Sequence, residues 1–453
     1  MLVFAHGIVG RADLPIPFEL FGAAAAVVLV LSFLALASGW TRPRLEQVRE
    51  RALFRLPLAV EVVCGAIGVF VFAVVVYAGL AGTSSQQDNL APTAVFVGFW
   101  VGVPFVSLLI GDWFRLFNPW RAIGRATGWA VGRLSRGEAT EVFPYPERLG
   151  HWPAAAGILA FVICELCWAT GRDPQPLAIL MLIYVFAMLA GQGVYGVEAW
   201  SRRGDAFGVW FGLFALLSPV GRREDGRLTL RPPVAGATRL QAGAGTVALL
   251  VIAIGSTGFD GASEGPLFNG FRPDLQDFFT SLGATLAVGL ELAYVVGLLV
   301  AIGIVGLLWW LGTSGMPRTG TDGMDRRALS RAFAHTLIPI AGAYVVAHYF
   351  SLLAYNGQDL WRLASDPLGD GSDLFGGADR SIDYSILSAT AIWYAQTLAL
   401  VAGHVAALVL AHDRALVLYR DPKAATRSQI VMLVLMVCFT CLGLYLLSAA
   451  LNG

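Results

Sequence analysis

Long apolar segments alternate with short polar ones along the whole chain. Ten of the apolar segments are candidates for membrane-spanning helices, because about 20 apolar residues in an α-helix cross a hydrocarbon layer of about 30 Å. They lie near residues 17–40, 57–80, 94–111, 152–170, 177–197, 242–258, 280–311, 332–356, 386–411 and 428–450. We therefore expect an all-α polytopic membrane protein, with residues 1–453 in a single helical bundle domain.

Two shorter aromatic segments, 113–134 and 206–219, are flanked by arginines. We interpret them as helices that lie in the membrane interface or re-enter the membrane. The stretches GDWFRLFNPWRAIGR (111–125) and GDAFGVWFGLFALLSPVGR (204–222) both begin with Gly-Asp, reach Asn-Pro or Ser-Pro, and end in Gly-Arg. A repeated unit of one span plus one interfacial helix explains this pattern, and so does the general preference of membrane interfaces for aromatic residues and Arg.

The basic residues are sorted to alternate polar intervals. If the N-terminus lies outside, 26 of the 31 Lys and Arg residues fall in the inner intervals 41–56, 112–151, 198–241, 312–331 and 412–427. The positive-inside rule then predicts ten spans with both termini outside. The outer intervals are rich in acids, which we interpret first as solvated loop charges; they include Asp260, Glu264, Asp274, Asp277, Asp359, Asp366, Asp370, Asp373, Asp379 and Asp383.

Composition agrees with a membrane protein. Hydrophobic residues make up 57% of the chain and charged residues 14%, with a mean hydropathy of +0.67, whereas soluble domains carry about 25% charged residues. The lipid bilayer is therefore the expected partner, and we expect no nucleic-acid partner. Lys423 is the only lysine among many arginines, which suggests a GC-rich bacterial genome and hence the bacterial plasma membrane.

Polar side chains from four predicted spans fall in one layer. A rise of about 1.5 Å per residue puts these side chains roughly 8 to 14 Å below the outer surface; they are Glu165, Glu291, His348 and Tyr394. Helical spacing also places four residues of one span on a single stripe; they are Tyr344, His348, Ser351 and Tyr355. Ionisable residues inside a membrane are costly and usually functional.

Two carboxylates and an imidazole are suitable ligands for a divalent ion, with zinc favoured and copper or manganese possible. Our first hypothesis is a metal site that activates water, with the ligands His6, Glu165, Glu291 and His348. Tyr344 or Tyr394 would donate a hydrogen bond to the developing charge. Alternatively, Glu291 carries a proton, or the layer is a hydrogen-bond network between helices.

The sequence does not decide the role of two further groups of residues, the CxxC pairs and a set of polar residues near the cytoplasm. Two CxxC pairs, Cys164 with Cys167 and Cys438 with Cys441, lie inside predicted spans, where Cys is either a small packing residue or a ligand for a soft metal. A second pool of polar groups lies toward the cytoplasm and comprises Glu61, Gln192, Glu198, His335, His404 and His412. If this inner pool connects to the outer layer, the two describe a proton or ion path.

Three stretches, AHGIVGRADLPIP, GDWFRLFNPWRAIGR and GDAFGVWFGLFALLSPVGRR, resemble a family of actinobacterial integral membrane proteins named fenitrothion hydrolase. The resemblance implies hydrolysis of an organophosphate ester. It brings no catalytic motif, and the chain has no Walker A loop, GxSxG elbow or HExxH sequence. Three functions remain open: a metal-dependent hydrolase of apolar esters, a proton- or metal-coupled transporter, and an accessory subunit of a membrane complex.

Overall fold

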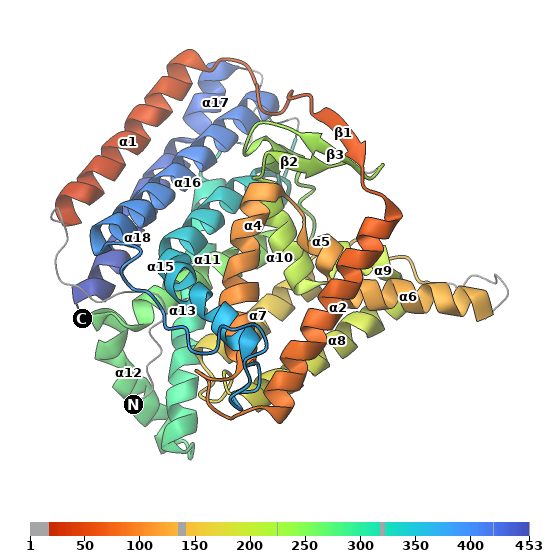
Figure 1. Cartoon of the computed structure of the whole chain (residues 1–453). Helices are drawn as coiled ribbons and strands as arrows, with labels where there is room; N and C mark the ends of the chain where they lie inside the picture. Colours follow the sequence, from red (N-terminus) through yellow and green to blue (C-terminus); the bar gives the residue numbers. More distant parts are fainter. Residues whose placement is uncertain are drawn as a thin grey trace.

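A computed structural model describes residues 18–134, 142–223, 225–317, 321, 323–419 and 421–452. These residues form an almost entirely helical bundle (Figure 1). Nine helical segments within them are long and apolar enough to cross a membrane. The expected fold class, an all-α polytopic membrane protein, is therefore confirmed.

The π-helix η1 and the 3₁₀-helices η2 and η3 interrupt or connect the α-helices. In chain order the helices are α1 (Phe18–Gly39), α2 (Leu58–Ala81), α3 (Leu90–Thr93), η1 (Ala94–Gly102), α4 (Val103–Ile110), α5 (Phe114–Phe117), α6 (Pro119–Leu134), α7 (Trp152–Leu166), α8 (Pro174–Tyr195), α9 (Val197–Arg203), α10 (Ala206–Ala215), η2 (Ala235–Arg239), α11 (Thr246–Ser263), α12 (Pro266–Ser281), α13 (Leu286–Ser314), α14 (Arg326–Phe333), η3 (Ala334–Thr336), α15 (Leu337–Ser365), α16 (Ala389–Leu418), α17 (Pro422–Ser428) and α18 (Ile430–Asn452).

Nine of the ten expected spans correspond to the nine long apolar segments. The tenth, expected near 152–170, is the 15-residue helix α7, which ends at Leu166. At about 1.5 Å per residue, α7 is too short to cross the hydrocarbon layer unaided. Beyond α7 the chain continues to Asp173, which accepts a hydrogen bond at 2.7 Å from the Gln86 side chain in the loop between α2 and α3. On the way, Arg172 contributes to the candidate site.

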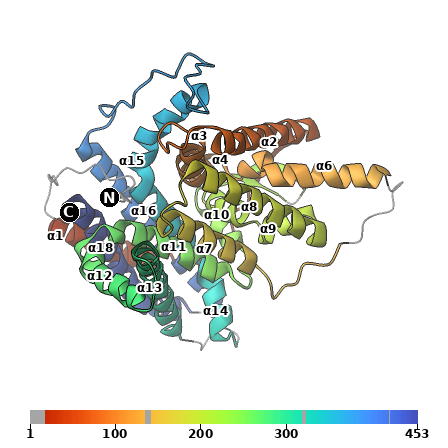
Figure 2. The same cartoon turned by 90° about the horizontal axis from the view of Figure 1, so that it is seen from below.

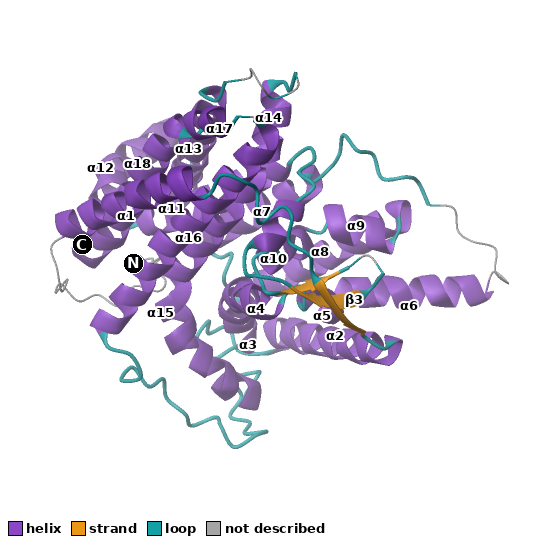
Figure 3. Cartoon of the chain, turned by 90° about the horizontal axis from the view of Figure 1, so that it is seen from above, coloured by secondary structure: helices purple, strands orange, loops and turns teal. Residues whose placement is uncertain are grey.

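Helices α11 and α15 form the centre of the bundle. Both are buried over most of their length, and α11 packs against α7, α13, α15 and α18. Figures 1 and 3 show α1, α16 and α18 side by side on one flank, and α2 and α8 on the other. Because lipid covers the outer helices, polar groups on α11 and α15 are the most isolated from both lipid and water.

The two short aromatic segments differ from each other in the structure. Helix α6 projects sideways from the bundle next to α2 (Figure 2), and its outer half exposes Trp129 and Leu134, as an interfacial helix does. Helix α10 is instead buried, with Trp210, Phe211 and Phe214 at most 1% exposed. A helix exposed at the membrane interface is therefore wrong for 206–219, because its aromatic side chains fill the space between α4 and α7, and the re-entrant alternative stays a prediction.

A small antiparallel sheet, which the sequence analysis did not predict, joins two of the basic intervals. Its strands are β1 (Arg51–Arg55), β2 (Val220–Arg222) and β3 (Arg227–Leu230), in the order β1-β3-β2. Next to it, Glu50 forms ion pairs with Arg231 at 3.1 Å and Arg239 at 3.0 Å. Strand pairing and buried charge thus hold together two segments that are 160 residues or more apart in sequence.

The five basic intervals of the sequence meet at one end of the bundle, which we call the basic end. His412 lies 2.9 Å from the Trp40 carbonyl oxygen, and the Tyr419 hydroxyl donates to the Pro317 carbonyl at 2.7 Å. At the opposite end, the Thr83 backbone N–H donates to the Leu368 carbonyl at 2.8 Å. Basic intervals therefore share one end of the bundle, and the loop after α2 meets the loop after α15 at the other.

Candidate functional site

A carboxylate and an imidazole are paired in the interior of the bundle. Asp260 on α11 and His348 on α15 are each 6% exposed. The His348 Nε2 atom lies 2.8 Å from Asp260 Oδ2, and the Tyr349 hydroxyl donates to the same oxygen at 3.0 Å. A single carboxylate oxygen therefore contacts two polar groups of the neighbouring helix.

Glu165, in the last turn of α7, adds a second carboxylate to this pair. It is 4% exposed, and its Oε1 atom lies 3.7 Å from the guanidinium of Arg172. Its Oε2 atom is buried and has no hydrogen-bond partner among the described residues. Asp260 is close enough for the two carboxylates to repel each other. We call Glu165, Asp260 and His348 the intramembrane cluster.

A long π-helical segment borders the intramembrane cluster. The span Leu90–Ile110 is continuous, but its middle, η1, has the wider π geometry over nine residues. Helix η1 packs against α15, and its Phe96 ring lies 4.8 Å from the guanidinium carbon of Arg172. Because π-helical turns are rare and concentrate at functional sites, this segment supports a functional role for the cluster.

Asp260 belongs to the site although it was not among the predicted site residues. The prediction that it lies in an outer loop is wrong, because α11 continues to Ser263 and buries this residue. Ser256, one helical turn earlier, is also buried. This four-residue spacing was a signal that the helix extends beyond the apolar run.

The structure brings together two of the predicted site residues, Glu165 and His348, by way of Asp260. Glu291 on α13 binds elsewhere, since its Oε1 atom accepts a hydrogen bond from the Ala169 backbone N–H at 3.0 Å, just after α7. Tyr394 is 43% exposed and has no hydrogen bond to the described residues. Tyr344 is buried near α18, where its hydroxyl lies 3.5 Å from the Phe439 carbonyl oxygen.

The predicted metal site remains a prediction. No group of three His, Cys, Asp or Glu residues in the described part of the chain is arranged to hold a metal ion. His6, one of the four predicted ligands, lies outside the described residues. The cysteines of both CxxC pairs are free thiols.

Buried histidines continue from the intramembrane cluster toward the basic end. The Tyr344 ring, one turn from His348, lies 6.3 Å from the ring of His404 on α16. The Nε2 atoms of His404 and of His335 on η3 are buried and have no hydrogen-bond partner among the described residues. His335 and His348 are 13 residues apart, which corresponds to about 20 Å of helix. We call the set of Tyr344, His404, His335 and His412, the last of which is at the basic end, the histidine line.

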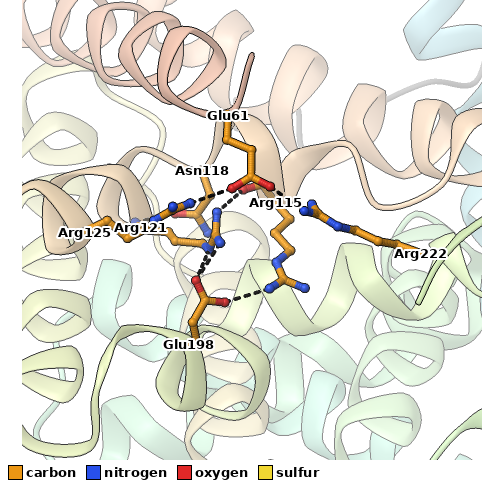
Figure 4. A network of polar contacts seen from close by, with 7 residues as sticks. All are labelled: Glu61, Arg115, Asn118, Arg121, Arg125, Glu198 and Arg222. Carbon is orange, nitrogen blue, oxygen red and sulfur yellow. Dashed lines mark hydrogen bonds and ion pairs between the residues drawn. The ribbon is translucent and has the colours of Figure 1, made fainter. Parts of the chain in front are cut away.

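Two other members of the predicted inner pool, Glu61 and Glu198, belong to a separate arginine network (Figure 4), whereas the buried Gln192 amide has no hydrogen-bond partner among the described residues. Glu61 on α2 is paired with Arg125 at 2.7 Å and with Arg222. Glu198 on α9 is paired with Arg115 at 2.7 Å and Arg121 at 2.6 Å. Burial raises the pKa of Glu198, but Arg121 and Arg115 outweigh it and hold this pKa below its usual range.

No family model, curated protein or solved structure matches the chain. The resemblance to the fenitrothion hydrolase family therefore remains a prediction, and the function has to be argued from the geometry.

Proposed function

We propose that the protein carries protons across the membrane, with the intramembrane cluster as the proton-binding site. The observation that carries this proposal is the unpartnered oxygen of Glu165 next to the Asp260–His348 pair. A buried carboxylate oxygen without a donor is a place where a proton can bind. Integral membrane character is shown by the apolar helices; proton transport is our inference.

Electrostatics favours a variable number of protons in the cluster. Three ionisable groups lie close together in a region where a charge without a partner is expensive. Arg172 compensates one negative charge at 3.7 Å, and a charged His348 would compensate a second. A proton that binds Glu165 removes one negative charge and with it the repulsion between Glu165 and Asp260.

The histidine line offers a route from this cluster toward the basic end. The rings of Tyr344 and His404 lie 6.3 Å apart, and α16 lies antiparallel against α15. Between His404 and the level of His335 lie about six residues, or 9 Å of helix, lined in part by Ala407 and Leu408. Ordered water is needed to bridge this gap, since a proton moves only between hydrogen-bonded groups.

Proton uptake into liposomes tests the proposal. The full-length protein is reconstituted with a pH-sensitive dye inside, and a potassium gradient with valinomycin makes the interior negative. We expect wild-type protein to acidify the interior faster than protein-free liposomes do. Glu165→Gln removes the protonatable oxygen at nearly constant shape, so we expect uptake to fall by about tenfold or more.

The matched control is Asp274→Asn, which changes an exposed acid of α12 and should leave uptake unchanged. Gel filtration and thermal unfolding in detergent establish that each variant folds. Wild-type uptake equal to that of empty liposomes, or full uptake by a folded Glu165→Gln variant, would refute the proposal.

Metal-dependent hydrolysis is the second candidate function. The observation that favours it is the adjacent carboxylate and imidazole of Asp260 and His348, 2.8 Å apart, which are group types that bind divalent ions. Elemental analysis of wild-type, His348→Ala and Glu165→Gln proteins by inductively coupled plasma mass spectrometry separates the two functions. Near-stoichiometric zinc, copper or manganese that is lost in the variants would favour a hydrolase, and would justify a screen with apolar phosphate esters.

A further inference from the structure

A cavity of about 200 Å³ lies at the basic end, next to the arginine network. One wall is polar and basic, with Arg115, Arg121 and Arg202 among its lining residues. The opposite wall is apolar and comes largely from α10, including Val209 and Leu213. The cavity is therefore suited to a ligand with an anionic group at one side and a small apolar part at the other.

The charges around the cavity do not cancel. Five arginines, of which Arg202 has no ion pair among the described residues, surround the cavity and the adjoining network together with four carboxylates. The arginines are Arg115, Arg121, Arg125, Arg202 and Arg222, and the carboxylates are Glu61, Asp112, Glu198 and Asp205. Burial raises the pKa of Asp112, although Arg115 opposes this shift. The surroundings thus have a surplus of positive charge, which an anion would neutralise.

The cavity also offers such an anion a hydrogen-bond donor and free space. The buried Ser201 hydroxyl lines the cavity and has no hydrogen-bond partner among the described residues. A Cβ atom added at Gly212, also a lining residue, would meet no other atom within 4 Å. His151 completes the wall and is already engaged, because its Nδ1 atom lies 2.8 Å from the Thr246 hydroxyl.

We propose that this cavity binds the phosphate group of a small phosphate ester or of an anionic lipid headgroup. Guanidinium groups match phosphate in charge and geometry, and the Ser201 hydroxyl adds a neutral donor. The apolar wall accommodates the carbon atoms that follow the phosphate. This site lies in the arginine network and uses none of the residues of the intramembrane cluster, so its test is independent of proton transport.

The test measures binding to the full-length protein in a neutral detergent. Inorganic phosphate and glycerol phosphate are titrated by isothermal titration calorimetry, and retention of dioleoyl phosphatidylglycerol is followed by native mass spectrometry. Two variants report on the site: Arg202→Gln removes an exposed, unpaired cation, and Gly212→Leu fills the cavity without changing charge. The control is Arg203→Gln, which lies outside the cavity, over the Tyr145 ring.

We expect at least one probe to bind, and both cavity variants to weaken binding by about tenfold or more. Arg202→Gln does so by loss of a charged hydrogen bond, and Gly212→Leu by occupying the space of the ligand. Arg203→Gln should bind like the wild type. Binding of the soluble probes identifies a phosphate ester as the ligand class, whereas variant-sensitive retention of the lipid alone identifies a headgroup. Absence of binding by every probe, or binding that neither cavity variant weakens, overturns the proposal.

Discussion

A single residue, Asp205, links the two similar stretches 111–125 and 204–222 in the folded protein. Its buried carboxylate accepts hydrogen bonds from Asn118 at 2.8 Å, Trp120 at 2.6 Å and Tyr184 at 2.8 Å. It also caps α10 through the Gly208 backbone N–H at 3.0 Å. The two similar stretches therefore meet in space, and one carboxylate satisfies donors from both.

Replacing Asp205 with alanine should destabilise the protein strongly. Asp205→Ala leaves three buried side-chain donors without an acceptor, at a cost of about 3 kcal/mol or more in the free energy of unfolding. The melting temperature in detergent, followed by tryptophan fluorescence, measures the effect. Asp225→Ala, in an exposed turn, is the control and should change the melting temperature little; equal melting temperatures for the two variants would contradict the assigned role.

Helices α11 and α13 are in close contact, and this contact positions α11, the helix that carries Asp260. A Cβ atom at Gly255 would lie 2.6 Å from the Ile302 Cα atom. Ile302 is in the middle of α13, so its backbone cannot shift without moving the helix. At Gly258, also on α11, an added Cβ meets nothing within 4 Å. Small residues at such crossings allow helices in membranes to approach closely.

This difference gives a matched pair of substitutions. Gly255→Ala should force the two helices apart and cost about 1 to 3 kcal/mol, and it should also slow proton uptake, because Asp260 moves relative to His348. Gly258→Ala should be neutral or slightly stabilising, since alanine is the better helix former. Thermal unfolding and liposome assays on both variants check this; an equal effect at both glycines would show that the contact is unimportant.

Sorting of basic and acidic intervals to opposite ends is a property of the whole molecule. Contacts at the basic end join intervals that are far apart in sequence, including a buried Asp413 that accepts hydrogen bonds from the Trp40 side chain at 2.9 Å and the Arg44 backbone at 2.6 Å. Because the translocation of basic intervals is disfavoured, we expect this end in the cytoplasm.

Cysteine labelling in intact cells tests that orientation. In a background without the five native cysteines, Asp379→Cys should react with a membrane-impermeant maleimide, because 379 lies in an exposed loop at the opposite end. Asp225→Cys, also exposed, should react only after the cells are lysed. The reverse pattern would show that both the orientation and the expected outward termini are wrong.

The fold class and nine of the spans follow from the sequence alone, because the length and polarity of each segment decide whether it can reside in lipid. Glu165 and His348 are also visible there, since an ionisable residue in an apolar run stands out without any partner. What these residues meet depends on the tertiary structure. Asp260 lies next to them on α11, Glu291 binds the chain after α7, and most of the inner pool divides into a histidine line and an arginine network, whereas the Gln192 amide stays unpartnered among the described residues. Helical period fixes the face on which a residue lies, whereas packing between helices distant in sequence decides which faces come together.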